Sequence, residues 1–292
     1  MDFSGEVLAQ ALVSGLMLGG MFALISIGLT LIWGVMKIIN FAHGEFLMIG
    51  LYVAYFLVAK TGMSPYLTIF ITIPAVVALG LILFKGTIDP ILKDPVMNQI
   101  MLTLGLSLIL QNLALTFFHA DVLSVRTGWT TRNLHLGSVV IGWSQIICFI
   151  GAVLCTLGIW YFLKVTDTGR AIRAAAQNPT AATLQGINVP WIYLLAFAIG
   201  SGTLGLAASL MIPFYYASPT VGLFLGLIAF IVVVLGGMGN LLGCFIAGII
   251  MGLAEAIGAA IFPGSYSRVF SFGIFILFLV FKPQGVLSRR PA

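Results

Sequence analysis

Few residues of this chain could do acid–base or ligand chemistry, and three of them fall within six positions. Asn40, His43 and Glu45 stand at the start of an apolar run that follows Lys37. Asn40 and His43 are three residues apart and would share a helix face, whereas Glu45 lies elsewhere unless Gly44 permits a break. Two interpretations stay open. The three residues line a pathway or gate for a solute, or they form a cap-and-anchor cluster at a membrane surface, where Glu45 near a helix N-terminus is favourable.

Other polar side chains inside apolar runs are scattered. Glu255 lies deep in a late run, and we expect a structural ion pair with Arg268 or a hydrogen-bonded carboxyl. Gln111 and Asn112 are expected to form hydrogen bonds between helices. The aromatic segment Pro213–Pro219 suits an interfacial belt, and the alternative is a place at the mouth of a pathway.

Motifs for catalysis and metal binding are absent from the sequence. There is no G-x-x-x-x-G-K-[ST] phosphate loop, no H-E-x-x-H pair and no G-x-S-x-G elbow. The histidines His43, His119 and His135 are far apart in sequence. We therefore predict no catalytic residue, no metal and no cofactor. Three classes of solute carrier stay open: a subunit that takes energy from a partner, an ion-coupled carrier that uses Glu45, His43 or Glu255, and a passive facilitator.

The composition is that of an integral membrane protein. The 292 residues are 61% hydrophobic and 7% charged, and the mean hydropathy is +1.16, whereas a soluble domain has roughly 25% charged residues. The net charge of +5 is spread over short loops, so it does not indicate nucleic-acid binding. Cys148, Cys155 and Cys244 lie in apolar stretches and read as small buried side chains.

The apolar runs predict an all-α polytopic bundle with about nine spans, and eight to ten are compatible with the pattern. We treat residues 1–292 as a single transmembrane domain. Val221–Gly236 is short and Ile38–Ala59 begins with polar residues, so either is a candidate for a re-entrant or broken segment. The nine runs are Val7–Trp33, Ile38–Ala59, Tyr66–Phe84, Met97–Phe118, Ser144–Leu163, Trp191–Ile212, Val221–Gly236, Leu241–Ile261 and Val269–Phe281.

The basic residues predict the orientation. With the N-terminus outside, nine lie on one side and four on the other, and the positive-inside rule makes the richer side cytoplasmic. The N-terminus is then on the outer side and the C-terminus is cytoplasmic. The cytoplasmic set is Lys37, Lys85, Lys93, Lys164, Arg170, Arg173, Lys282, Arg289 and Arg290, and the outer set is Lys60, Arg126, Arg132 and Arg268.

One long loop, at about residues 164–190, is polar, basic and helix-forming at once. Asn178 and Pro179 read as an N-cap and a first-turn proline, and Gly186 as a stop after Thr180–Gln185. A helix of under two turns is marginal in water and gains stability by docking. We therefore predict that this loop docks on a cytoplasmic partner protein.

Small residues recur every four positions in several runs. Such rows let helix backbones approach closely in lipid. The simplest interpretation is packing within one bundle, and the alternative is a subunit interface. The rows are Gly15 with Gly19, then Gly239, Gly243 and Ala247, and then Gly248, Gly252, Ala256 and Ala260.

Four stretches resemble one family. Gly15–Tyr55, which contains Ile39-Asn40-Phe41-Ala42-His43-Gly44-Glu45-Phe46, resembles LivH-type permeases of bacterial ATP-binding cassette importers for branched-chain amino acids. Asp167–Asn188 resembles the cytoplasmic coupling loop of that family, and Val232–Ala256 its glycine-rich late spans. The tail Lys282–Leu287 is similar to the usual Arg-Pro-x-Gly-Leu ending.

The resemblance implies a multi-pass permease of the bacterial inner membrane, surrounded by lipid, with no ATPase of its own. Its expected partners are two ATP-binding subunits, a second permease of the LivM type and a periplasmic substrate-binding protein. ATP is used by the partner subunits. The residues expected to couple to the ATPase are Gly169, Arg170, Arg173, Asn178, Pro179 and Gly186, and those expected in the pathway or gate are Asn40, His43 and Glu45.

The chain departs from the family pattern at a few places. Ala174-Ala175-Ala176 stand where Glu-Ala-Ala is common, Lys282 replaces an arginine, and the Thr87–Val96 loop carries Asp89 and Asp94. Leucine, isoleucine and valine are the family expectation, and urea, short amides and other amino acids are the alternatives.

Overall fold

The computed structural model describes residues 5–262, 266–282 and 285–286, and each predicted apolar run contains a helix. The structure is therefore an all-α polytopic bundle, as predicted. The long helices are α1 (Gly5–Met36), α2 (His43–Thr61), α3 (Ile69–Leu83), α4 (Val96–Phe118), α5 (Trp143–Val165), α8 (Val189–Met211), α9 (Val221–Gly236), α10 (Leu241–Ile261) and α11 (Tyr266–Phe281).

The count of nine full spans is not confirmed. Within the described residues, seven helical stretches are long and apolar enough to cross a membrane. One of them, Pro65–Ile91, joins the 3-10 turn η1 (Pro65–Thr68), α3, the π-turn η2 (Phe84–Ile88) and the 3-10 turn η3 (Asp89–Ile91). α9 and the apolar part of α11, Val269–Phe281, are shorter than a span.

The remaining elements are small and lie in three loops, α4–α5, α5–α8 and α8–α9. α6 (Asp167–Gln177) and α7 (Pro179–Leu184) connect α5 to α8. β2 (Asn133–Leu136) and β3 (Val139–Gly142) form an antiparallel hairpin, while β1 (Leu123–Ser124) pairs with β4 (Tyr216–Ala217).

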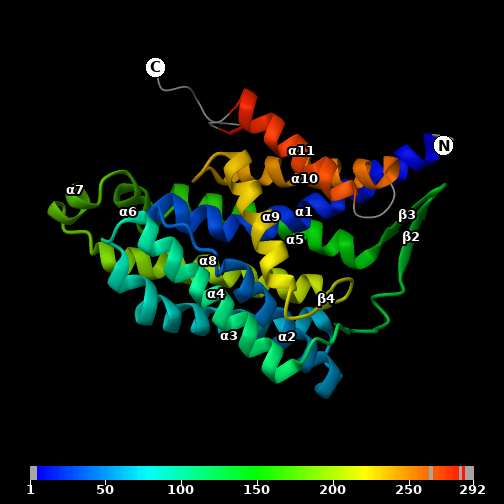
Figure 1. The fold of residues 1–292 in the computed structure, drawn as a ribbon, viewed down its shortest axis with the longest axis horizontal. Coiled ribbons are helices and arrows are strands. Elements are labelled where there is room, and N and C mark those ends of the chain that lie inside the picture. The colour runs from blue at the N-terminus through cyan, green and yellow to red at the C-terminus, as the bar shows by residue number, and fades with distance from the viewer. Residues whose placement is uncertain (1–4, 263–265, 283–284, 287–292) are drawn as a thin grey trace.

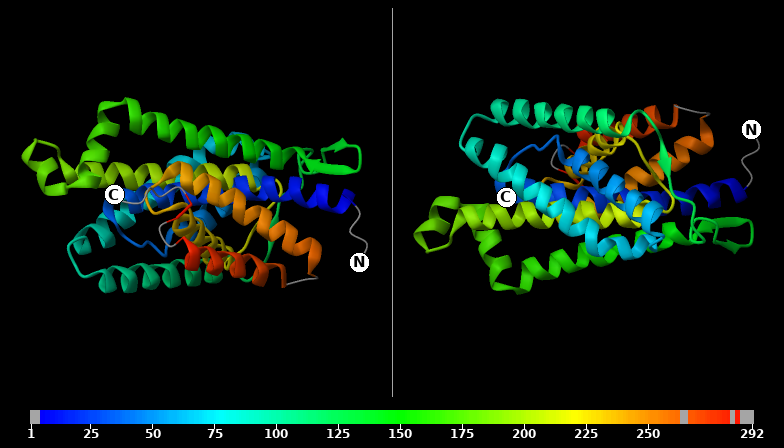
Figure 2. Two further views of the ribbon diagram at one scale, coloured as in Figure 1. Left: turned by 90° about the horizontal axis from the view of Figure 1, so that it is seen from above. Right: turned by 90° about the horizontal axis from the view of Figure 1, so that it is seen from below.

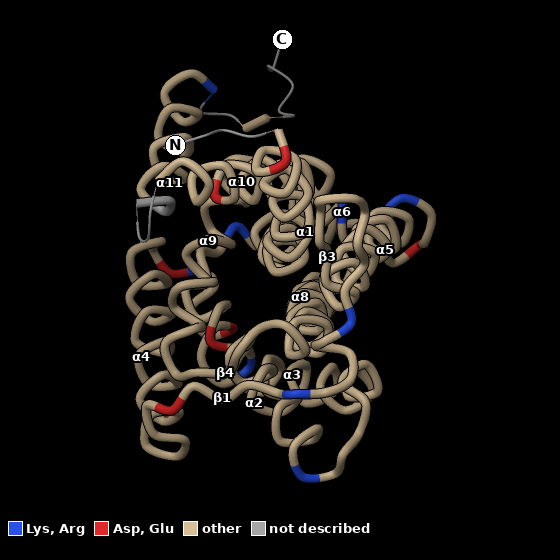
Figure 3. The backbone as a smooth tube through the Cα atoms, turned by 90° about the vertical axis from the view of Figure 1, so that its right-hand side faces the viewer, with Lys and Arg blue, Asp and Glu red and all other residues tan. Residues whose placement is uncertain are grey.

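The bundle has two distinct ends. Figure 1 shows α7 at one end of the long axis, and the β2–β3 hairpin with the N-terminus at the other. The views in Figure 2 show the same separation, so we call these the α7 end and the hairpin end. α1 and α8 run in opposite directions and are seen end-on near the middle of Figure 3, where charged residues are sparse.

Two of the basic residues that the sequence assigns to the cytoplasmic side lie at the α7 end. Lys37 directly follows α1 and Lys164 lies in the last turn of α5, both at the α7 end. The side chain of Arg268, and Arg289 and Arg290, lie outside the described residues.

The glycine rows pack α1 against α10. A Cβ atom added at Gly19 would lie 2.6 Å from the Cα of Ile249, and one at Gly248 would lie 2.8 Å from the Cα of Ala23. Real side chains do not tolerate such distances, so only glycine allows the two backbones to approach this closely. The interpretation as packing within one bundle is confirmed for these rows.

α2 does not begin at the end of the bundle. α1 ends at Met36, residues 37–42 are non-helical, and α2 starts only at His43, whose ring reaches the middle of α1. The predicted run Ile38–Ala59 is therefore a non-helical stretch up to residue 42 followed by an unbroken helix that is long enough to span a membrane, and the non-helical stretch is tolerated because protein surrounds it.

The first and second halves of the chain repeat each other in opposite directions. α1 leads through a loop into α2 as α8 leads into α9, and α1 packs on α10 as α8 packs on α3. Equivalent residues of the two halves are in contact. Gly28 lies eight positions before Met36, the last residue of α1, and it contacts Thr203, which lies eight positions before Met211, the last residue of α8. Gly44 of α2 meets Gly222 of α9 in the same way, each being the second residue of its helix. The centre of the bundle is therefore the place where α2 and α9 begin.

Candidate functional site

The predicted pathway residues Asn40, His43 and Glu45 lie together inside the bundle, at 3%, 1% and 0% exposure. The Nε2 atom of His43 lies 3.1 Å from the carbonyl oxygen of Ile25, in the middle of α1. The hydroxyl of Ser107, in the middle of α4, donates to Oε1 of Glu45 at 3.0 Å. We call Asn40, His43, Glu45 and Ser107 the buried polar cluster.

Two sequence interpretations of this cluster need correction. Asn40 and His43 do not share a helix face, because α2 begins only at His43. The Oδ1 atom of Asn40 instead accepts a hydrogen bond from the backbone N–H of Ala42 at 3.1 Å. An anchor at the membrane surface does not fit either, since the partners Ile25 and Ser107 belong to the middles of their helices.

The buried polar cluster is incompletely hydrogen-bonded. The Nδ2 atom of Asn40, Nδ1 of His43 and Oε2 of Glu45 are buried and have no hydrogen-bond partner among the described residues. Leaving a buried polar atom unpaired costs about 1–3 kcal/mol. Atoms of this kind gain free energy when water or a polar solute reaches them, so the cluster can exchange partners if the helices part.

Sequence reasoning missed the residues that hold this cluster from other helices. The hydroxyl of Thr103 in α4 lies 3.1 Å from the carbonyl oxygen of Ile39 in the non-helical segment and 3.0 Å from that of Gln99 in its own helix, so it can donate to either. Gly222 and Gly226 of α9 lie against Gly44. The only sequence signal for the α9 contact is the repeated spacing of Gly44 and Phe46 in Gly222 and Phe224.

The prediction for Asn112 is wrong. Its Nδ2 atom donates to the carbonyl oxygen of Leu108 in the same helix at 2.7 Å, and the residue is exposed. Its bond therefore stays within α4 and does not join two helices.

The short helix α7 forms as its sequence predicts. The side chain of Asn178 accepts a hydrogen bond from the backbone N–H of Ala181 at 3.0 Å, and Pro179 is the first helical residue. Gly186 ends the turn with a φ of +80°, a conformation that favours glycine.

α6 was not predicted as a separate helix, although it has its own cap. The hydroxyl of Thr166 accepts from the backbone N–H of Gly169 at 2.9 Å, and Arg170 pairs with Asp167 on the exposed side. Gly169 is buried, and a Cβ atom there would lie 2.6 Å from the Cα of Leu163. Gly169 thus lets α6 fold back on α5, whereas Arg170 and Arg173 face outward.

A small hydrophobic cluster, separate from the main core, anchors the α6–α7 loop to the bundle. Ile172 and Ala175 of α6 and Ala182 of α7 are buried at 1%, 0% and 4% exposure. α6 and α7 therefore share a buried cluster with two helices at the centre of the bundle. The remaining buried members come from α1 and α8: Leu31, Val35, Val189, Ile192 and Ala196.

The opposite face of α7 is exposed. Leu184, which sequence reasoning did not single out, has 83% of its surface exposed. Asn178, Pro179 and Gly186 are exposed beside it. A short helix with one face buried in the bundle and an exposed leucine on the other face is suited to docking on another protein.

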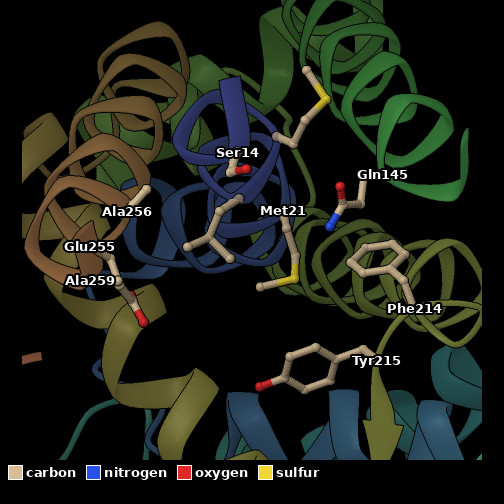
Figure 4. Close-up of a pocket in the computed structure, with 10 residues that line it drawn as sticks. Ser14, Met21, Gln145, Phe214, Tyr215, Glu255, Ala256 and Ala259 are labelled. Carbon is tan, nitrogen blue, oxygen red and sulfur yellow. The ribbon is translucent and has the colours of Figure 1, made fainter. Parts of the chain in front are cut away.

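A cavity of about 370 Å³ lies at the hairpin end. Its walls come from α1, α5, α10 and the segment after α8, and they include Ser14, Met21, Gln145, Tyr215 and Glu255 (Figure 4). The predicted ion pair of Glu255 with Arg268 falls on a side chain outside the described residues.

Known proteins identify the family to which this arrangement belongs. The family described as "Branched-chain amino acid transport system / permease component" matches residues 11–279. The chain belongs to this family. The permease matches no solved structure.

The curated relatives match over nearly the full length. The permease is 34% identical over 293 residues to the high-affinity branched-chain amino acid transport system permease protein LivH of Escherichia coli, covering 96% of this chain and 95% of that protein. It is 33% identical to the high-affinity branched-chain amino acid transport system permease protein BraD of Pseudomonas aeruginosa, again covering 96% of this chain and 95% of that protein. A probable LivH of Methanocaldococcus jannaschii is 26% identical over 279 residues, or 91% of this chain and 88% of that protein.

These matches confirm the resemblance inferred from the sequence, and they make the chain a multi-pass membrane permease.

In the tail, the backbone N–H of Val286 donates to the carbonyl oxygen of Leu235 at 2.8 Å, which ties the tail to α9. Pro283, Gln284 and Leu287 lie outside the described residues.

Proposed function

We propose that this chain is the permease subunit of an ATP-driven importer for branched-chain amino acids in a bacterial inner membrane. Its partners are two ATP-binding subunits, a second permease of the LivM type and a periplasmic substrate-binding protein. The permease itself holds no cofactor and performs no ATP chemistry. The names of its relatives and the match over nearly its whole length support this assignment.

The structure of the α6–α7 loop is the observation that supports coupling of the permease to ATP-binding subunits. Leu184 is 83% exposed, while Ala182, two residues before it, is 4% exposed and belongs to the buried cluster that α6 and α7 share with α1 and α8. An ATP-binding subunit that holds Leu184 therefore pulls or pushes on the central helices through this cluster. Arg170, Arg173, Asn178, Pro179 and Gly186 shape the exposed face, and Gly169 sets the position of α6.

The pathway runs through the centre of the inverted repeats. Transporters built from such repeats bind their solutes where discontinuous helices meet. Here α2 and α9 begin beside Asn40, His43 and Glu45, and contact each other through glycines. These side chains form the closed gate, and their unpaired atoms become hydrated when α2 and α9 separate.

The orientation follows from the position of α7. A loop that docks on ATP-binding subunits is cytoplasmic, so the α7 end faces the cytoplasm and the hairpin end faces the periplasm. The excess of basic residues predicted for that side supports the same assignment.

The test replaces exposed leucines at opposite ends. Leu184→Glu places a charge at the expected contact with the ATP-binding subunit, and Leu136→Glu, at a residue that is 58% exposed on the hairpin, is the matched control. We expect Leu184→Glu to lose the ATP-binding subunits during purification and to lose leucine uptake, while Leu136→Glu keeps both. Normal recovery of the ATP-binding subunits with Leu184→Glu contradicts the assignment of α7.

A further inference from the structure

A groove of about 390 Å³ runs along α2 beside the end of α4. It extends from Ile49 to Lys60 and Thr61, the last two residues of α2, and it includes Phe118, the last residue of α4. The groove therefore opens where two membrane helices end. Its other lining residues are all aromatic or aliphatic: Tyr52, Val53, Phe56 and Leu57.

Aromatic rings join α2 to α4 at this groove. The rings of Tyr52 and Phe118 are stacked with their centroids 4.2 Å apart, and the ring of Phe56 lies 5.3 Å from that of Phe118. Ring pairs of this kind stabilise a contact beyond the area that they bury. The groove is therefore part of a packed surface that the two helices share. Tyr52 belongs to the core, whereas Ile49, Val53 and Leu57 are partly exposed and accessible to a ligand.

One cation stands at the mouth of the groove. The Nζ atom of Lys60 lies 5.4 Å from the centroid of the Phe56 ring, within the range of a cation–π contact. Lys60 is exposed, and in the described part of the chain it forms no salt bridge. It is also the only charged residue that lines the groove among the described residues. The ring thus holds a positive charge at the groove without neutralising it.

The length and width of the groove limit its occupant. Ile49 and Lys60 are eleven residues apart, which is about 16 Å along a helix and matches one leaflet of a hydrocarbon core of about 30 Å. A volume of about 390 Å³ over that length gives a mean cross-section of about 24 Å². A helix of about 10–12 Å diameter needs at least about three times that area. The groove therefore fits one unbranched hydrocarbon chain rather than a helix of a partner protein.

The charge at the mouth selects the headgroup. A hydrocarbon chain that follows the groove places the head of its lipid beside Lys60, at the end of α2. A lysine near the membrane surface attracts an anionic headgroup and makes its binding about fivefold tighter. A zwitterionic headgroup has no net charge and gains less from the same lysine.

We propose that this groove binds one anionic phospholipid, with an acyl chain along Ile49, Val53 and Leu57 and the phosphate at Lys60. The bound lipid braces α2, the helix that begins at the buried polar cluster, against α4. This site goes beyond the proposed function, because it requires only that the chain is a membrane protein. A failure of the lipid site therefore leaves the transport assignment unchanged.

Native mass spectrometry of the full-length permease tests the headgroup preference. The protein is titrated with phosphatidylglycerol or with phosphatidylcholine of the same acyl chains, and the dissociation constants of the first bound lipid are compared. We expect the parent to bind phosphatidylglycerol about fivefold more tightly, and Lys60→Gln to bind both lipids alike.

A second lysine over an aromatic ring provides the matched control. The Nζ atom of Lys164 lies 4.6 Å from the centroid of the Trp160 ring in the last turn of α5, outside the groove. Lys164→Gln should keep the preference for phosphatidylglycerol. Equal binding of the two lipids by the parent, or an equal loss of preference in Lys164→Gln, overturns the proposal.

The hydrocarbon part is tested by filling the groove. Leu57→Trp enlarges a lining side chain and should weaken the binding of phosphatidylglycerol severalfold, whereas Leu154→Trp, at a residue of α5 that is 64% exposed, should not. Glycerol phosphate, which offers the phosphate without a chain, should neither bind nor compete. Competition by glycerol phosphate, or undiminished binding by Leu57→Trp, contradicts the lipid site.

Thermal melting in detergent gives an independent readout. Phosphatidylglycerol should raise the melting temperature of the parent more than phosphatidylcholine does, because it braces α2 against α4. Lys60→Gln should melt at the same temperature with either lipid. A larger rise with phosphatidylglycerol that persists in Lys60→Gln would show that another part of the permease binds the anionic lipid, and it would overturn the proposal.

Discussion

At the scale of single residues, the main feature is a set of polar side chains kept without full hydrogen bonding. Glu45 has one donor, Ser107, and its other carboxylate oxygen is unpaired among the described residues. A core selected only for stability would replace such groups with apolar ones, because unpaired polar atoms cost free energy. This incomplete hydrogen bonding is what supports the proposal that the cluster rearranges during transport.

The single bond to Glu45 gives a stability prediction. Ser107→Ala removes the only described donor to the carboxylate, so we expect the permease to lose about 1–3 kcal/mol of stability and to melt earlier in detergent. Thr116→Ala, on the exposed face of the same helix, is the control, because its hydroxyl bonds only within α4. Equal melting temperatures for the two variants would show that the bond to Glu45 contributes nothing.

The sequence predicted which residues are unusual here but not how they are held. Asn40, His43 and Glu45 stand out because they are polar in an apolar run. Ser107, however, lies 62 positions from Glu45, and nothing local indicates that the two meet. The helix start at His43 was also missed, because Asn40 is compatible with a helical wheel until its bond to Ala42 is seen.

At the scale of elements, the α6–α7 loop shows where local signals suffice. The Asn178 cap, Pro179 and the Gly186 stop act within a few residues, so the sequence predicted α7 almost to its ends. The buried face of α6 was not predictable in this way. Ile172 and Ala175 are buried only because α1 and α8 supply Val35 and Ile192, which are distant in sequence.

The loop gives a prediction about transport. Gly186→Ala forces an L-residue into a left-handed conformation, which costs about 1–2 kcal/mol and frays a helix of six residues. Arg173→Ala removes an exposed charge on α6. We expect both variants to lose leucine uptake while their abundance in the membrane stays normal.

A glycine of the same conformation at the other end provides the control. Gly137 in the hairpin has a φ of +63°, so Gly137→Ala carries a similar strain away from α7. This variant should transport normally. Unimpaired uptake by both Gly186→Ala and Arg173→Ala would refute the coupling role of the loop.

The contact between α2 and α9 gives a third prediction. A Cβ atom at Gly44 would lie 2.8 Å from the Cα of Gly226 and closer still to the carbonyl oxygen of Gly222. Gly44→Ala should therefore push the two helices apart and destabilise the closed gate. Its membranes should leak leucine without ATP, or the protein should fail to accumulate.

The control for that variant is a glycine in an open position. Nothing lies within 4 Å of a Cβ atom at Gly105 in α4, so Gly105→Ala should keep normal abundance and tight membranes. Normal, ATP-dependent uptake by Gly44→Ala would contradict the close contact of α2 and α9.

At the scale of the whole molecule, the sequence predicted the helices better than their relation to the membrane. Hydrophobic runs located every long helix because burial in lipid requires continuous apolar sequence. The same criterion does not distinguish a full span from a somewhat shorter helix buried in protein, such as α9 with 16 residues. The inverted repeat escaped notice because only a few positions, such as Gly44 and Gly222, keep the same residue.

In the proposed mechanism, α7 transmits mechanical work from the ATP-binding partners into a bundle that has no energy source of its own. Leucine accumulation in liposomes tests this most directly, with either the purified permease alone or the complete importer. We predict accumulation only for the complete importer supplied with ATP and loaded binding protein, and none for the permease alone under an imposed proton or sodium gradient. Concentration of leucine by the permease alone, driven by the ion gradient, would contradict the account.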